Sequence, residues 1–339
     1  MRTADFDYYL PLERIAQVPL EPRHSSRLLV MDRTTNELQH KTFWNLIDYL
    51  QPDDLLVMND TRVIPARIFA RKLPGGGKVE LLLLRKDGDK TWEVLVGGSG
   101  MRPGREVAVG DGLHGLVTAE LDGARRMIEF SEPVEYHLEK VGHVPLPPYI
   151  HTRLEDAERY QTVYARQPGS AAAPTAGLHF TPELLDRLLQ KGVQIAYVDL
   201  HVGLDTFAPV TEEHADEHRI HSEWCQLTQV TADMINATKA INRRVIAVGT
   251  TSVRTLESAA VKSQGGIVQA FSGPTNLYIL PGYPFKVVDA MITNFHLPKS
   301  TLLMLVSAFA GRERILSSYA TAVEMNYRFF SFGDAMLIL

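Results

Sequence analysis

The sequence predicts an α/β main domain, discontinuous along the chain, that carries an inserted small all-β, barrel-like domain. Near both ends of the chain, apolar strand patterns alternate with helix patterns, which is typical of α/β domains. Between them, short strand patterns follow one another with Asp-Gly pairs at their junctions. With 339 residues, the chain is also long enough for two cores. We therefore expect the α/β domain at 1–65 and 150–339, and the β domain at 66–149.

The first 65 residues predict two buried strands that flank a helix. Arg27–Met31 and Leu55–Met58 are continuous apolar runs closed by polar residues, as in buried strands. Between them, apolar residues from Phe43 to Leu50 recur at helical spacing, and Pro52 ends this helix.

The inserted domain is predicted from short β-rich segments separated by turn signals. Asp-Gly pairs at Asp87, Asp111 and Asp122 are strong hairpin-turn signals. The expected strands are 78–84, 91–96, 106–109, 116–121 and 126–130. So many short strands in succession favour a small barrel.

After residue 156, strands and helices alternate again. Thr181 stands at an N-cap position before a proline and an acidic residue, which predicts a helix start. A strand at 194–200 follows it, and a second strand at 244–248 leads through the turn 249–252 into another helix. Ser300 or the next residue can cap a further apolar helix.

Composition and termini favour a cytoplasmic protein. Hydrophobic residues make up 45% and charged residues 22%, as in ordinary globular proteins. The N-terminus lacks the apolar stretch of a secretory signal, and no apolar run is long enough to span a bilayer. The single cysteine, Cys225, cannot form an intrachain disulfide, which agrees with a reducing compartment.

Charge is unevenly distributed along the chain. The net charge is -5, so the whole molecule does not indicate nucleic-acid binding. The segment Arg62–Lys86, however, carries basic residues opposed by the single acid Glu80, whereas acids dominate 205–223. A basic stretch is often only a solvated face. If its side chains converge on one surface, however, they can neutralise phosphates of an RNA.

Two local patterns are candidates for chemistry. The strand-to-helix turn 249–252 offers hydroxyl groups and a helix N-terminus, which suit an anion, although such a turn can be a plain helix cap. His214, Glu217 and His218 form an H-x-x-E-H pattern, which on a helix can bind zinc. Because that pattern is short, an acidic surface segment explains it as well.

Longer motifs resemble one family, the S-adenosylmethionine:tRNA ribosyltransferase-isomerases of queuosine biosynthesis. They occur in order over essentially the whole chain. The matching segments are Asn59–Arg67, Gly169–Phe180, Gly249–Glu257 and Thr293–Pro298, with shorter ones at Phe6–Tyr8, Ile15–Gln17, Tyr160–Tyr164 and Tyr327–Phe330.

The resemblance implies transfer and isomerisation of the ribosyl group of S-adenosylmethionine. The acceptor is 7-aminomethyl-7-deazaguanine at the tRNA wobble position, the product is epoxyqueuosine in tRNA, and adenine and methionine leave. S-adenosylmethionine is then a consumed co-substrate, no cofactor and no metal is required, and tRNA is the macromolecular partner. Neither a membrane nor an obligate protein partner is expected.

The resemblance also suggests the site residues. His179 and His296 are candidates for proton transfer, since imidazole titrates near neutral pH. The 249–252 turn would hold the methionine carboxylate or another anionic group, arginines would bind phosphate or carboxylate, and aromatic rings would stack on adenine or the wobble base. The expected substrate-binding residues are Arg62, Arg67, Tyr160, Tyr164, Thr175, Phe180, Gly249, Thr250, Thr251, Ser252, Arg254, Asn294 and Phe295.

Two positions depart from the family's pattern. His24 stands where an acidic residue is usual, and Asp205 where we expect a glycine, which puts the local loop shape in doubt. Two other functions stay open: a zinc hydrolase that uses His214, Glu217 and His218, and a non-catalytic RNA-binding protein that uses the basic segment.

Overall fold

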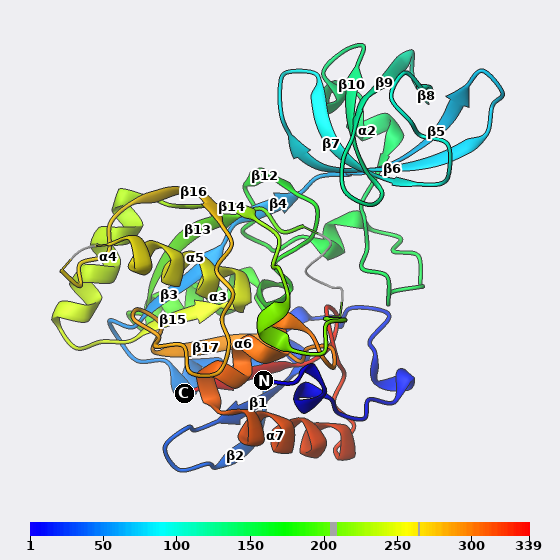
Figure 1. The fold of residues 1–339 in the computed structure, drawn as a ribbon. Helices are drawn as coiled ribbons and strands as arrows, with labels where there is room; N and C mark the ends of the chain where they lie inside the picture. The colour runs from blue at the N-terminus through cyan, green and yellow to red at the C-terminus, as the bar shows by residue number, and fades with distance from the viewer. Residues whose placement is uncertain (204–208, 264) are drawn as a thin grey trace. The chain divides into compact units, whose positions relative to one another are not determined.

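The computed structural model confirms an α/β domain with an inserted all-β barrel (Figure 1). The described residues are 1–203, 209–263 and 265–339. The first compact unit comprises 1–62, 147–167 and 173–339, and the second comprises 63–146 and 168–172. The chain crosses between the units at 62/63, 146/147, 167/168 and 172/173. The first crossing lies in β4 (Thr61–Val63) and the third in β12 (Gln167–Ser170). Asp205 lies outside the described residues.

The first unit is built on a nine-stranded mixed sheet. Its strands, in spatial order, are β16 (Phe271–Thr275), β14 (Glu223–Leu227), β13 (Gln194–Leu200), β3 (Leu55–Asn59), β15 (Val245–Val248), β17 (Ala290–Asn294), β18 (Ala335–Ile338), β1 (Arg27–Met31) and β2 (Leu38–Thr42). The four central strands from β13 to β17 are mutually parallel. Their carboxyl ends therefore meet at one edge of the sheet.

Helices cover both faces of this sheet. Because side chains alternate along a strand, Leu55 and Val57 enter one core and Leu56 and Met58 enter the other. The helices of the first core are α4 (Gln229–Ala240), α5 (Gly249–Lys262), α6 (Thr301–Ala310) and α7 (Arg312–Glu324), and those of the second are α1 (Leu46–Tyr49) and α3 (Pro182–Gln190). Both faces are buried, which explains why the central strands are continuously apolar.

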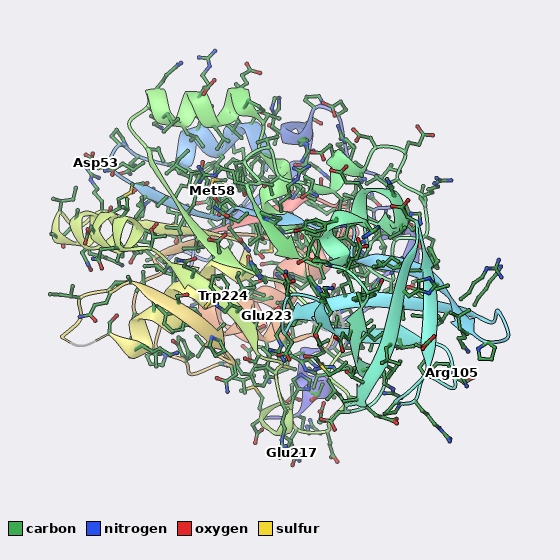
Figure 2. The ribbon with its side chains drawn as sticks, turned by 90° about the horizontal axis from the view of Figure 1, so that it is seen from above. Asp53, Met58, Arg105, Glu217, Glu223 and Trp224 are labelled. Atoms are coloured by element: carbon green, nitrogen blue, oxygen red, sulfur yellow. The ribbon has the colours of Figure 1, made fainter. Side chains whose placement is uncertain are left out.

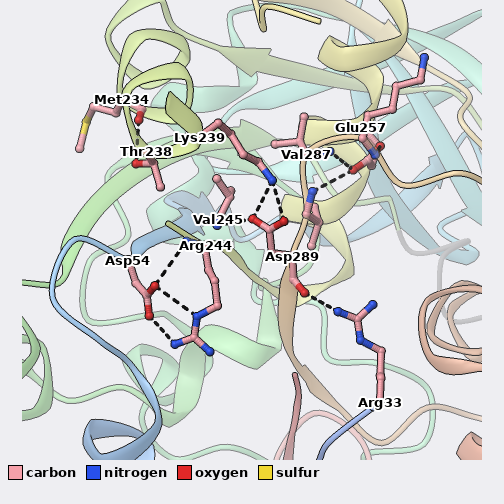
Figure 3. A network of polar contacts seen from close by, with 12 residues as sticks. Arg33, Asp54, Met234, Thr238, Lys239, Arg244, Val245, Glu257, Val287 and Asp289 are labelled. Carbon is pink, nitrogen blue, oxygen red and sulfur yellow. Dashed lines mark hydrogen bonds and ion pairs between the residues drawn. The ribbon is translucent and has the colours of Figure 1, made fainter. Parts of the chain in front are cut away.

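Ion pairs fix the amino ends of the central strands (Figure 3). Asp54, just before β3, accepts hydrogen bonds from Arg244, just before β15, with 3.2 Å between Oδ1 and Nε. Asp289, just before β17, accepts from the backbone N–H of Val245 and from Nζ of Lys239, each at 2.7 Å. These contacts hold three neighbouring strands in register.

The predicted helix starts are confirmed at two caps. The Thr181 side chain accepts a hydrogen bond from Leu184 N at 3.3 Å, and the Ser300 side chain accepts one from Leu303 N at 3.1 Å. The expected helix over 43–50 is shorter: a 3-10 turn precedes the single turn of α1. Within the described residues, we find no helix with both the length and the apolar character needed to cross a bilayer.

The second unit is an antiparallel barrel, closed because β5 pairs with both β6 and β8. The strands in order are β5 (Arg67–Leu73), β6 (Lys78–Lys86), β7 (Thr91–Gly97), β10 (Arg125–Phe130), β9 (Leu113–Glu120) and β8 (Glu106–Gly110), with β11 (Gly142–His143) beside β5 after the one-turn helix α2 (Leu138–Val141). Asp111 and Gly112 have φ of 51° and 77°, which suits the predicted tight turn between β8 and β9.

Candidate active site

A pocket opens in the first unit at the carboxyl ends of β15 and β17. In parallel sheets this edge is the usual place for a ligand, and the pocket, together with the solvent at its mouth, encloses about 610 Å³. The lining residues are Tyr149, 173–176, Val202, 249–251, 293–297, Ser300, Leu302, Phe330 and Ser331.

The pocket brings together three predicted motifs that are far apart in the sequence. The predicted site residues that line it are Thr175, Gly249, Thr250, Thr251, Asn294, Phe295 and His296. They come from the segment before α3, from the first turn of α5 and from the end of β17. Sequence motifs therefore identified its walls.

The 249–252 turn is the first turn of α5 itself, so the helix starts earlier than expected. Gly249 has φ of 83°, which lets β15 pass directly into the helix. No side chain caps this helix, and the buried Oγ1 of Thr251 has no hydrogen-bond partner among the described residues. Ser252 is a correction: it is fully buried and its Oγ donates to Val248 O at 2.7 Å, so it is not available to a ligand.

Asn294 connects three segments of the pocket wall. Its Oδ1 accepts from Thr175 Oγ1 at 3.1 Å, and its Nδ2 donates to Phe330 O at 3.3 Å. The orientation of the amide is thereby set, so Nδ2 also donates to His179 Nε2, at 3.1 Å. His179 must then carry its proton on Nδ1 and donate it to Ser26 Oγ at 2.8 Å.

The two histidines proposed for proton transfer are both buried, which lowers their pKa values. Burial lowers the pKa of His296 to about 3. Burial, with the charges of Arg328 and Arg23, lowers the pKa of His179 to about 3. Both rings are therefore neutral at pH 7. His296 lines the pocket, whereas His179 lies behind Asn294.

His296 is held from three sides. Its Nε2 is 2.8 Å from Thr293 Oγ1, its backbone N–H donates to Tyr319 OH at 3.0 Å, and its carbonyl accepts from Tyr8 OH at 2.5 Å. Nδ1 makes no hydrogen bond within the described part of the chain. It is therefore the ring atom that a ligand in the pocket can use.

The aromatic residues expected to stack on a base are buried, which corrects that expectation. Tyr160, Phe180 and Phe295 have no exposed surface, and Tyr164 is 8% exposed. The ring of Phe295 packs in the first core, although its residue borders the pocket. The hydroxyl of Tyr164 occupies the place where a Cβ on Gly177 would stand, 2.0 Å from it, so this position needs a glycine. These rings support the pocket from within.

The three predicted arginines do not meet in the pocket. Arg62 forms an ion pair with Glu158 on the surface of the first unit. Arg67 lies in the barrel and pairs with Glu80 at 2.9 Å. Arg254 is buried on α5 and lines a second pocket.

Sequence reasoning missed several pocket residues. The hydroxyl of Tyr149 is 2.7 Å from Ser331 Oγ, and both residues line the pocket. Phe330 has φ of 68°, which is strained for a bulky residue and typical of functional sites. The Tyr327–Phe330 motif pointed toward it, whereas no signal in the sequence identified Tyr149.

The zinc pattern does not form the expected helix. Only Ala215–Glu217 form a 3-10 turn, and His214 and His218 flank it. His218 Nδ1 instead lies 3.0 Å from Glu212 Oε2. In the described ranges, no group of three or more His, Cys, Asp or Glu side chains is arranged to hold a metal ion.

His24, which stands where the family usually has an acidic residue, lies close to the start of α3. Its Nδ1 is 2.8 Å from Thr181 Oγ1.

Known proteins match this chain over nearly its full length. The family model described as "Queuosine biosynthesis protein" matches residues 3–338. A crystal structure of an S-adenosylmethionine tRNA ribosyltransferase from Thermotoga maritima is 39% identical, with a TM-score of 0.58. That match covers 99% of this chain and 100% of the other chain.

Proposed function

The chain belongs to the queuosine biosynthesis family, and from this premise we propose that it is an S-adenosylmethionine-dependent tRNA ribosyltransferase-isomerase. It transfers and isomerises the ribosyl group of S-adenosylmethionine onto 7-aminomethyl-7-deazaguanine at the wobble position of tRNA. The product is epoxyqueuosine-tRNA, and adenine and methionine leave.

The observation that carries this proposal is the convergence of the family-like motifs on one pocket. Segments around residues 175, 250 and 294 line a single pocket of about 610 Å³ at the carboxyl edge of the parallel strands. A ribosyltransferase of this class needs a small-molecule site with polar groups on several sides. The name of the 39% identical relative supports the same reaction class.

Chemistry assigns roles to the pocket residues. The sulfonium acidifies the adjacent 5′ C–H, which a base must remove, and adenine leaves more readily when it receives a proton. Nδ1 of His296 is the proposed site of proton transfer. In the neutral tautomer that carries the ring proton on Nε2 and donates it to Thr293 Oγ1, Nδ1 is the atom that can accept a proton. His179 is proposed as a positioning residue that acts through Asn294. Because neither ring ionises near pH 7, neither should produce a break between pH 6 and 8 in the pH–rate profile.

The barrel is the proposed tRNA-binding surface. Arg71 and Lys78 stand directly opposite each other on β5 and β6. Like charges in cross-strand pairs destabilise a sheet, so such a pair suits an anionic partner. Lys86, by contrast, forms an ion pair with Glu135 of the same unit. We propose that Arg71 and Lys78 contact tRNA phosphates.

The reaction also defines the other proposed requirements. S-adenosylmethionine supplies both the ribosyl group and the leaving groups, so it is consumed and the proposed chemistry needs no further cofactor or metal. Because tRNA is the proposed substrate, we propose a cytoplasmic location and no obligate protein partner.

Release of adenine tests the proposal directly. The protein is incubated with S-adenosylmethionine and a tRNA that carries the precursor base, and adenine and modified tRNA are quantified. We expect both products to form together. The matched control is the same tRNA with unmodified guanine at the wobble position, which should give neither. Absence of adenine with the precursor tRNA, or adenine release that requires zinc, would contradict the proposal.

A further inference from the structure

A second pocket lies in the same unit, beside the proposed active site. Its lining residues are His218, Ile220, His221, Glu223, Arg254, Leu277, Tyr278, Ile279, Thr301, Leu302 and Leu305. Leu302 lines both pockets, and on α5 Thr251 borders the first pocket while Arg254 borders the second. Three helical residues correspond to about 4.5 Å along the axis. The two pockets therefore adjoin each other at Leu302 and along the first turns of α5.

Arg254 has an unused donor group in this pocket. The residue is 4% exposed, its Nη1 pairs with Glu223 Oε2, and its Nε donates to Leu277 O at 3.2 Å. Its Nη2 has no hydrogen-bond partner among the described residues. A buried donor on a charged group that lacks a partner is costly, and a bound carboxylate would satisfy it.

Glu223 gives the pocket an opposite charge next to this arginine. It lies on β14 and is 8% exposed, and its Oε1 accepts from Gly203 N at 2.9 Å. Figure 2 labels Glu223 and the next residue of the strand, Trp224. A guanidinium and a carboxylate side by side match a zwitterion, and the apolar side chains of Ile279 and Leu305 flank them. This combination fits an α-amino acid with an apolar side chain.

We propose that the second pocket binds the α-amino-acid end of S-adenosylmethionine, with Arg254 Nη2 on the carboxylate and Glu223 on the ammonium group. The inference rests on the proposed function and makes it more specific. It places the carboxylate at Arg254 instead of the N-terminus of α5. The methionine that leaves in the reaction keeps the same two contacts, so it is a product inhibitor that competes with S-adenosylmethionine.

Ligand analogues test this site on the unaltered protein. Calorimetry without tRNA compares methionine with methioninol, which lacks the carboxylate, and with 4-(methylthio)butanoate, which lacks the ammonium group. We expect each analogue to bind about tenfold or more weakly than methionine, because each leaves one buried charge without its partner. Equal affinity for methionine and methioninol would overturn the assignment of Arg254.

Substitutions locate the site. Arg254→Lys keeps the charge but removes the second guanidinium arm, so it should raise the Michaelis constant for S-adenosylmethionine about tenfold and abolish discrimination between methionine and methioninol. Arg244→Lys is the matched control, since Arg244 also pairs with a buried carboxylate, at the opposite end of β15 (Figure 3). It should bind both ligands as the wild type does. If Thr251→Val abolished the discrimination and Arg254→Lys did not, the carboxylate would lie at the N-terminus of α5.

The two proposals fail in different ways. Wild-type protein that releases adenine but does not distinguish methionine from its analogues disproves this inference alone. Protein that binds methionine in the expected order but releases no adenine contradicts the proposed function and leaves the amino-acid site supported. If Arg254→Lys does not fold, as judged by its thermal unfolding, the binding of the analogue series to the wild type decides whether the amino-acid site exists.

Discussion

Replacing Asn294 by aspartate should reverse the way in which the contribution of His179 to folding stability depends on pH. Nδ2 of Asn294 donates to Phe330 O at 3.3 Å and to His179 Nε2 at 3.1 Å. A carboxylate oxygen at that place cannot donate to Phe330 O, so that contact becomes acceptor against acceptor. Neutral His179 keeps its contact when the ring proton moves from Nδ1 to Nε2 and Ser26 Oγ donates to Nδ1. Asn294 itself is 5% exposed, so water does not replace the lost partner.

The size of the effect at high pH follows from the contact with Phe330 O. A buried polar group left without a partner costs about 1–3 kcal/mol, so Asn294→Asp should lower the free energy of unfolding by about that amount at pH 8. At lower pH, the protonated ring of His179 can donate to the new carboxylate. The pKa of His179, which burial lowers to about 3 in the wild type, should then rise above its value in the unfolded chain.

The sign of the pH dependence distinguishes the two proteins. In the wild type the folded pKa of His179 lies below the unfolded value of about 6.5, so stability falls as pH drops from 6.5 toward 3. In Asn294→Asp the folded pKa of His179 lies above its unfolded value. The ion pair between His179 and the new carboxylate therefore stabilises the fold at low pH, and this stabilisation is lost as pH rises through the folded pKa.

Urea unfolding at pH 8 and pH 5.5 measures both effects. The control is Asn236→Asp: Asn236 also donates through Nδ2, to Val268 O at 2.8 Å, and no histidine bonds to it among the described residues. Its loss of stability should be similar at the two pH values. A loss in Asn294→Asp that is equally large at both would show that His179 Nε2 does not accept from Asn294. A variant as stable as the wild type would refute the whole network.

Four further outcomes are expected. Thr251→Val should raise the Michaelis constant for S-adenosylmethionine about two- to tenfold, the size of a neutral hydrogen bond, with tRNA affinity unchanged in a filter-binding assay. Burial lowers the pKa of His296 to about 3, so below pH 6.5 this residue should lower the free energy of unfolding of the wild type by up to about 1.4 kcal/mol per pH unit. In urea titrations, His296→Gln should show a weaker dependence of the free energy of unfolding on pH. Burial and a neighbouring carboxylate raise the pKa of Asp199 to about 7, so its contribution to folding stability is fully present below about pH 3.8 and is lost as pH rises toward 7. Asp199→Asn should therefore be more stable than the wild type in thermal unfolding at pH 7.5. Arg71→Ala combined with Lys78→Ala should lower the slope of log tRNA affinity against log salt by roughly one for each lost phosphate contact, and an unchanged slope would exclude this face.

The sequence by itself determined the features that depend on neighbouring residues. The caps at Thr181 and Ser300, the tight turn at Asp111 and the apolar central strands all follow from local propensity and periodicity. The barrel followed from the succession of short strands. Motif resemblance also identified the segments of the pocket wall, because those motifs are long and nearly continuous.

Only the tertiary structure decided which of these residues face the pocket. Tyr160 and Phe180 belong to the same motifs as Thr175, yet their rings are buried in the core. The pKa of His296 depends on burial by segments distant in sequence, which no local pattern records. Resemblance had already named Arg254 as a substrate-binding candidate, but only folding buried it beside Glu223 and left one of its arms without a partner among the described residues. Burial and partnership arise from contacts between distant segments, so they exist only once the chain has folded.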